Sequence, residues 1–159
     1  LAGKRVLICG AGGATRGAIL PILRESPACL FVANRTVDKA QALVQAFRAN
    51  GAGDTLQGGG YEALAERRFD VVINATSASL SAALPPLPAS AFEADGLAYD
   101  MVYGKGLTPF LKQAQAAGVG RVADGVGMLV EQAAEAFEWW RGVRPDTKPV
   151  IERFTVPLI

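Results

Sequence analysis

The stretch that decides the fold is VLICGAGGATRG, residues 6–17. An apolar run ends in a glycine-rich segment, and apolar residues return with helical spacing from Arg16 onward. This order of strand, tight turn and helix is typical of a diphosphate site, because glycine lets the backbone approach a ligand closely and a helix N-terminus attracts anions. The alternative is a plain strand-to-helix turn. We expect the pyrophosphate of a dinucleotide to bind at Gly10, Ala11, Gly12, Gly13 and Ala14.

The bulk composition indicates one domain with no polyanion-binding surface. The chain has 159 residues, with 16 basic against 15 acidic side chains and a net charge of +1. No apolar run reaches the roughly 18 residues that span a bilayer, so we expect a soluble, cytoplasmic protein. Histidine is absent, which argues against a metal site and leaves any proton transfer to Lys, Tyr, Asp or Glu. Cys9 and Cys29 lie in apolar runs and are expected to be buried, reduced thiols.

Apolar strand-like runs alternate with helical segments along the whole chain. This alternation predicts an α/β fold, a Rossmann-like, doubly wound and mainly parallel six-stranded sheet with helices on both faces. The expected strands are 5–9, 29–33, 55–57, 70–74, 97–101 and 121–123, and the expected helices are 14–25, 37–49, 61–67, 109–117, 127–140 and 149–154. We expect a loop over 77–88 and a helical turn near 90–92.

The residues that follow the second strand determine which dinucleotide would fit. A carboxylate there accepts the ribose hydroxyls of NAD, whereas a basic residue accepts the extra phosphate of NADP. Here the segment is Asn34-Arg35-Thr36, and Lys39 follows in the first turn of the next helix. Two cations and a hydroxyl therefore favour NADP. The alternative is that Thr36 only caps the helix and Arg35 is solvated.

Other predicted strands also end in polar side chains or in methionine, at the edge where open α/β sheets bind ligands. Asn74 and Thr76 are placed to hydrogen-bond ribose or phosphate, although polar turns are common everywhere. Met101 and Met128 offer a polarisable wall for a nicotinamide ring, or fill the core instead. Gln132 lies one turn after Met128 and is expected to face the same crevice.

Six motifs, taken together, resemble the shikimate dehydrogenase family. In chain order they are GAGGA at 10–14, NRT at 34–36, NATS at 74–77, YDMVY at 99–103, KGLTPFL at 105–111 and DGVGMLVEQAAEAF at 124–137. The resemblance runs from Leu1 to about Pro149. It implies the NADP-binding half of an enzyme that reduces 3-dehydroshikimate to shikimate, in the pathway to chorismate and the aromatic amino acids.

The resemblance also implies individual roles. Met101 and Gly125 would line the nicotinamide, with Met128 beside it, while Tyr103 and Gln132 would reach the substrate. Lys39 stands where the family often has arginine. Two positions depart from the family: Thr15 replaces a common alanine, and Ser79 replaces a common glycine.

In this family the catalytic Lys and Asp belong to an N-terminal domain. None of the lysines here matches that position, so no catalytic residue is assigned and we expect the chain to be inactive alone. Residues 1–159 are interpreted as the NADP-binding domain of a longer protein, starting at Leu1 after a missing substrate domain. In the family the final helix packs toward that domain, so the resemblance implies that residues 142–159 expose apolar surface in the isolated chain. A homodimer is a further expected partner.

Two other functions are compatible with the same residues. A non-catalytic NADP-binding sensor or regulatory module would explain the lack of an acid–base residue, and a quinate dehydrogenase would share this half of the fold. A methyltransferase is disfavoured, because it would need an acidic residue where Asn34-Arg35 stands.

Overall fold

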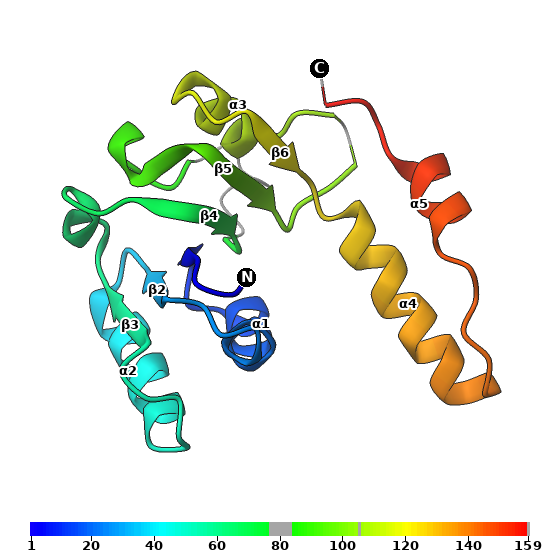
Figure 1. Cartoon of the computed structure of the whole chain (residues 1–159), viewed down its shortest axis with the longest axis horizontal. Coiled ribbons are helices and arrows are strands. Elements are labelled where there is room, and N and C mark those ends of the chain that lie inside the picture. Colours follow the sequence, from blue (N-terminus) through cyan, green and yellow to red (C-terminus); the bar gives the residue numbers. More distant parts are fainter. Residues whose placement is uncertain (77–83, 105, 159) are drawn as a thin grey trace.

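A computed structural model describes residues 1–76, 84–104 and 106–158 and shows one six-stranded sheet (Figure 1). The strand order is β3-β2-β1-β4-β5-β6, and every neighbouring pair is parallel. The order reverses between β1 and β4, which places the crevice of a doubly wound sheet beyond the end of β1. The predicted fold class is confirmed.

The elements follow the predicted alternation closely. The strands are β1 (Arg5–Cys9), β2 (Cys29–Ala33), β3 (Leu56–Gly59), β4 (Phe69–Asn74), β5 (Phe92–Asp100) and β6 (Arg121–Ala123). The α-helices are α1 (Gly13–Arg24), α2 (Val37–Arg48), α3 (Pro109–Ala116), α4 (Val126–Arg141) and α5 (Lys148–Phe154), and short 3-10 turns form η1 (Tyr61–Leu64) and η3 (Ala89–Ala91). The predicted loop at 77–83 and the Ser79 departure lie outside the described residues.

Apolar layers cover both faces of the sheet, because strand side chains alternate between them. Val6 and Ile8 pack with α1 and α2 on one face. Leu7 and Cys9 pack with α3 and the two 3-10 turns on the other. Cys9 is buried as predicted, whereas Cys29, at the start of β2, is only half-buried; both are free thiols. None of the described helices is long and apolar enough to cross a bilayer.

Three elements differ from the prediction. Strand β3 includes two glycines, because a Cβ at Gly58 would lie 2.7 Å from a methyl group of Val44 on α2. This close packing of helix on strand admits only glycine. The helix expected over 61–67 is a single 3-10 turn. Strand β5 begins at Phe92 rather than 97, because its register against β4 shifts between Phe69 and Val71 and absorbs the polar residues that look like a turn.

Thr15, one of the two departures from the family pattern, ties α1 to the end of β1. Its side chain is fully buried, and its hydroxyl donates a hydrogen bond of 2.8 Å to the Gly10 carbonyl oxygen. The added hydroxyl therefore pairs a carbonyl within the glycine-rich turn and fixes the turn against the helix that follows it.

An ion cluster joins three strands at the amino edge of the sheet, opposite the crevice. The Arg5 guanidinium donates to both carboxylate oxygens of Asp70, at 3.0 and 3.1 Å, and to Glu93 at 2.9 Å. The backbone N–H of Arg5 also donates to Asp70, at 2.7 Å. These hydrogen bonds stabilise the ionised carboxylate and lower the pKa of Asp70 from 3.8 to about 2.

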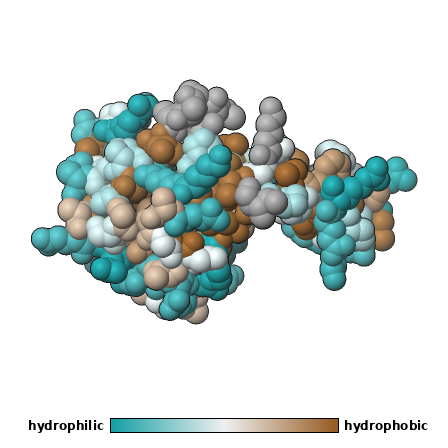
Figure 2. Space-filling model, turned by 90° about the horizontal axis from the view of Figure 1, so that it is seen from above, coloured by the Kyte–Doolittle hydropathy of each residue, from teal (hydrophilic) through white to brown (hydrophobic). Residues whose placement is uncertain are grey.

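Helices α4 and α5 form an arm that stands off from the sheet (Figures 1 and 2). Arg144 holds the segment between them against α4 by bonding three glutamates of that helix at 2.7 to 3.0 Å, and the Thr147 hydroxyl, just before α5, donates to one of these, Glu131. The arm buries little: of α4 only Val126 and Ala134 are buried, and of α5 no residue. Several large apolar side chains of the arm are therefore exposed, among them Trp139, Trp140, Val143 and Phe154.

The Asp70 cluster predicts a loss of stability in acid. The depressed pKa means that the paired carboxylate stabilises the fold fully above about pH 4 and loses that contribution as pH falls through about 2. We expect Asp70→Asn to lower the free energy of unfolding by about 1–2 kcal/mol at pH 7, allowing for the partial exposure of the pair. Urea unfolding from pH 7 to pH 2 should show the two proteins converging. A gap that is constant across this range would contradict the role of the carboxylate.

Thr15 predicts a second effect on stability. Thr15→Val keeps the branched shape but leaves the Gly10 carbonyl without its hydroxyl donor, and should cost about 1 kcal/mol in the free energy of unfolding. Thr15→Ser is the matched control, because it retains the hydroxyl. Urea denaturation measures both variants, and equal stabilities for the valine and serine variants would show that the hydrogen bond contributes nothing.

Candidate nucleotide-binding site

The strands bring their carboxyl ends to one line along the crevice. Across the sheet, Cys9 is paired with Ala33 on one side and with Asn74 on the other, and Asn74 is paired with Asp100. The residue that follows each strand is then held by a backbone bond to its neighbour: Gly10 N–H donates to Ala33 at 2.7 Å, and Met101 N–H donates to Asn74 at 3.0 Å. The sheet register itself therefore gathers the predicted site residues.

The glycine-rich turn leaves β1 in a conformation that needs glycine. Gly10 has a φ of +103°, and a Cβ there would lie 3.1 Å from both the Ala75 carbonyl oxygen and the Thr76 methyl group. The turn is thus pressed against the segment that follows β4. A side chain at residue 10 would push these two segments apart and widen the crevice at its base.

The amino end of α1 is open above this turn. Gly12 occupies the N-cap position with no side-chain cap bond, and a Cβ at Gly12 or Gly13 would have no protein atom within 4 Å. Gly12, Gly13 and Ala14 are exposed. Free backbone N–H groups and the positive end of the helix dipole therefore face open space, an arrangement that suits an anion such as a diphosphate.

Two cations stand on the opposite wall of the crevice, at the end of β2. Arg35 and Lys39 are both exposed, and neither forms an ion pair within residues 1–76, 84–104 and 106–158. Thr36 occupies the N-cap position of α2 as predicted, yet its side chain makes no cap bond. The Asn34 amide holds this segment instead, by donating to the Thr36 carbonyl at 2.9 Å. The Thr36 hydroxyl is thus not used as a helix cap.

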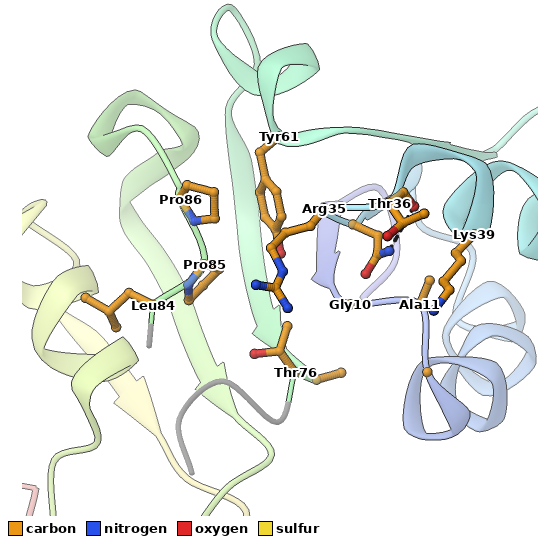
Figure 3. Close-up of a pocket in the computed structure, with 13 residues that line it drawn as sticks. Gly10, Ala11, Arg35, Thr36, Lys39, Tyr61, Thr76, Leu84, Pro85 and Pro86 are labelled. Atoms are coloured by element: carbon orange, nitrogen blue, oxygen red, sulfur yellow. Dashed lines mark hydrogen bonds between the residues drawn. The ribbon is translucent and has the colours of Figure 1, made fainter. Parts of the chain in front are cut away.

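These walls enclose a cavity of about 380 Å³ (Figure 3). Of the predicted residues, those that line it are Gly10, Ala11, Gly12, Asn34, Arg35, Thr36, Lys39 and Thr76. The sequence interpretation missed the rest of the lining, which comprises Tyr61, Ala75, Leu84, Pro85 and Pro86. Ala75 belongs to the NATS motif, but Tyr61, Leu84, Pro85 and Pro86 come from segments with no recognisable motif, and only the fold places them here. No carboxylate is among the described residues that line the cavity, so this lining is basic and neutral.

Tyr61 contributes an aromatic ring to this cavity. Figure 3 shows the ring between the Arg35 side chain and Pro86. Burial raises the pKa of Tyr61, and the nearby Arg35 charge opposes that shift, so the phenol is neutral at physiological pH. A flat apolar surface beside a guanidinium is suited to an aromatic base with an adjacent phosphate.

The structure gives Asn74 an internal position rather than the exposed one that a direct contact with ribose would need. Its side chain is fully buried, with the amide donating to Asp100 at 3.0 Å and the oxygen accepting from the Thr76 N–H and hydroxyl. Thr76, in contrast, is half-exposed and lines the cavity. Of the two residues, only Thr76 is placed to contact a ligand, and Asn74 holds Thr76 in position.

Met101, Tyr103 and Gly125 come together beyond the end of β5. A Cβ at Gly125 would overlap the Met101 carbonyl oxygen and lie 3.2 Å from the Tyr103 ring. Gly125 N–H also donates to Val102 at 3.4 Å. The three predicted residues therefore form one contact cluster, and only glycine fits at its centre.

Met128 and Gln132 lie on α4 and are less closely placed. Both are exposed, and the Gln132 amide donates to the Leu129 carbonyl of its own helix at 2.9 Å. Neither lines the basic cavity described above. Their predicted contacts with nicotinamide and substrate stay predictions.

Comparison with known proteins gives the same family for both ends of the chain. Residues 1–83 match the family described as shikimate / quinate 5-dehydrogenase, and residues 125–153 match the shikimate 5'-dehydrogenase C-terminal domain. The shikimate dehydrogenase (NADP(+)) of Dechloromonas aromatica is 56% identical over 159 residues, which is 100% of this chain and 57% of that protein. The chain thus spans little more than half of this relative.

Two solved structures share the fold. An Ael1 enzyme from Pseudomonas putida is 55% identical with a TM-score of 0.89, over 100% of this chain and 57% of that one. The shikimate 5-dehydrogenase of Thermus thermophilus, solved with NADP(H) and shikimate, is 34% identical with a TM-score of 0.76, over 94% of this chain and 53% of that one. The family match over residues 1–83 and the agreement in fold and sequence show that the chain belongs to the shikimate/quinate dehydrogenase family.

Proposed function

We propose that this chain is the NADP(H)-binding domain of a shikimate dehydrogenase. The observation that carries the proposal is the pairing of an open helix N-terminus with two cations, Arg35 and Lys39, in one cavity. The names of the relatives support the same cofactor and substrate. The reaction would be the reversible reduction of 3-dehydroshikimate to shikimate with NADPH.

The charge of the cavity lining suits the adenosine half of NADP. The diphosphate would lie over the N-terminus of α1, beside Gly10 to Ala14, and the 2′-phosphate would be held by Arg35, Thr36 and Lys39, with Asn34 keeping that segment in place. Charge-assisted hydrogen bonds to a phosphate contribute about 1.5–3 kcal/mol each. Since no carboxylate lines the cavity, NAD finds no acceptor for its ribose hydroxyls there.

The nicotinamide half would lie beyond β5, against Met101 and Gly125, with Met128 beside it. When bound, the nicotinamide supplies or accepts the hydride. The Gly125 cluster leaves the Met101 backbone close to the start of α4, and Tyr103 is exposed beside it, at the side from which a substrate would approach. Gln132 would reach the same substrate from α4.

The cavity that suits the adenosine half offers no group for proton transfer, which would take place at the nicotinamide end. Its lining holds no carboxylate, and the one lysine in it, Lys39, stands on the wall assigned to the adenosine phosphate. The catalytic Lys and Asp would belong to an N-terminal domain of the full-length enzyme, outside these 159 residues. The exposed apolar side chains of the α4–α5 arm and of Val156 would pack against that domain. The expected homodimer stays a prediction.

A second candidate function is a non-catalytic NADP-binding sensor. The basic and neutral lining of the cavity favours it, because binding needs no acid or base. A quinate dehydrogenase is the remaining alternative within the family, since the family description names both substrates. The experiments below separate these functions.

The two cations predict a strong preference for NADPH over NADH. Replacing Arg35 by alanine removes one charged contact with the 2′-phosphate and should narrow that preference by about ten- to a hundredfold. Fluorescence titration of the chain with each nucleotide measures the effect. NADH affinity should change little, because NADH lacks the phosphate.

The matched control is Lys112→Ala, which removes an exposed cation of α3 outside the cavity. It should leave both affinities within about twofold, since Lys112 does not line the cavity and exposed charges are screened by salt. Equal affinity of the unmodified chain for NADPH and NADH would overturn the NADP assignment.

The assignment of proton transfer to an N-terminal domain predicts that residues 1–159 need that domain for activity. We expect the isolated chain to bind NADPH without oxidising or reducing substrate. A fusion of this chain to the N-terminal part of the Dechloromonas aromatica relative should turn over, at least about a hundredfold faster than the chain alone, because general acid–base catalysis contributes that much. Absorbance of NADPH at steady state measures the rate with shikimate and with quinate.

The outcomes discriminate among the three functions. Turnover with shikimate supports the proposed enzyme, and faster turnover with quinate supports the second family activity. A folded fusion that binds NADPH and catalyses neither reaction favours the sensor. Substantial activity of the isolated chain would contradict the assignment of proton transfer to the N-terminal domain.

A further inference from the structure

We infer that Asn74 and Asp100 are positioning residues that set the two halves of the nucleotide site in register with each other. The inference rests on the proposed function and goes beyond it, because neither side chain is placed to touch the cofactor. Asn74 ends β4 behind the adenosine half, and Asp100 ends β5 behind the nicotinamide half. Their side chains are both fully buried and are bonded to each other at 3.0 Å.

Each member of the pair also holds the loop that follows its own strand. The Asn74 oxygen accepts from the Thr76 N–H at 3.1 Å and from the Thr76 hydroxyl at 2.7 Å. The Asp100 oxygen that accepts from Asn74 also accepts from the Val102 N–H at 3.1 Å. Val102 lies between Met101 and Tyr103, so this bond places both of their backbones.

The connection continues to both ends of the site. On the adenosine side, the Thr76 methyl group is the near neighbour of Gly10 in the glycine turn. On the nicotinamide side, the Val102 carbonyl accepts from Gly125 N–H, at the start of α4. A dinucleotide that contacts both ends of the site gains the full binding free energy of each contact only if the spacing of the two ends is fixed before binding. The second contact then costs little further loss of conformational entropy in the protein.

Burial makes the pair rigid. A buried amide and carboxylate are costly to leave unpaired, so their bonds persist and hold the two strand ends in a single arrangement. The second Asp100 oxygen accepts from the Thr108 hydroxyl at 2.6 Å, and Thr108 in turn caps α3 through the Leu111 N–H. This last branch anchors Asp100 to the core, away from both loops.

The Thr108 branch provides a matched control. Thr108→Val removes one bond to the same carboxylate and the cap of α3, so it lowers stability without touching the bonds to Asn74 and Val102. Asp100→Ala removes all of these bonds. Asp100→Asn is the conservative variant, because its oxygen still accepts from Asn74 and Val102 while its amide donates to Thr108. If Asp100 only stabilised the fold, the loss of NADPH affinity would parallel the fall in melting temperature across Asp100→Ala, Asp100→Asn and Thr108→Val.

The experiment compares a whole ligand with its half. Isothermal titration gives the dissociation constants of NADPH and of adenosine 2′,5′-bisphosphate for each variant, and thermal unfolding gives the melting temperature. The dissociation constant of the fragment divided by that of NADPH reports the gain in affinity from binding both halves. We expect Asp100→Ala to lower this ratio by about tenfold, with the fragment nearly unaffected because the Asn74–Thr76 bonds are local. Asp100→Asn and Thr108→Val should keep the native ratio.

Asn74→Ala tests the same claim if Asp100→Ala does not fold. It cuts the bridge from the β4 side and leaves the Val102 and Thr108 bonds to Asp100, but it also removes the two bonds from Thr76. We therefore expect it to weaken the fragment as well, and to weaken NADPH more, so that the ratio still falls. A native ratio in these bridge variants, or a fall in Thr108→Val as large as in Asp100→Ala, would overturn the inference. Failure of the unmodified chain to bind either nucleotide would instead contradict the proposed function.

Discussion

The structure depends on the close approach of two backbone segments at the base of the crevice. Gly10 turns out of β1 with a positive φ and rests against Ala75 and Thr76, which follow β4. No other residue type allows both the conformation and the contact. Because β1 and β4 flank the point where the strand order reverses, this contact sets the position of the helix N-terminus relative to every other strand end.

Buried polar groups hold the site around that contact. Thr15 bonds the Gly10 carbonyl from α1, and the side chains of Asn74, Asp100 and Thr108 link β4, β5 and α3. The groups proposed to meet the ligand are mostly exposed, as Arg35 and Lys39 are. The fold thus separates two tasks: buried hydrogen bonds fix geometry, and exposed cations and open N–H groups supply affinity. This division leaves the phosphate-binding groups free of competing protein partners on the described wall.

The sequence predicted the strands correctly where local residue chemistry determines the structure. Strands β1, β2 and β6 have their predicted bounds, since each is an apolar run closed by turn residues. The glycine turn and the NRT segment also line the predicted cavity. Predictions failed where tertiary contacts decide. The glycines of β3 look like a turn until α2 is packed on them, and the polar residues after Phe92 in β5 look like a turn although they lie where the strand shifts register against β4. Tyr61 and the Pro85–Pro86 wall carry no motif, so only the fold reveals them.

The central claim is that one cavity binds a diphosphate through helix N–H groups and a third phosphate through Arg35 and Lys39. A crystal structure of the chain with NADP⁺ tests it most directly. We predict the diphosphate over the N-terminus of α1, and the 2′-phosphate within hydrogen-bond distance, about 2.7–3.2 Å, of both cations. A nucleotide bound elsewhere, or one whose 2′-phosphate points away from Arg35 into solvent, would contradict the account.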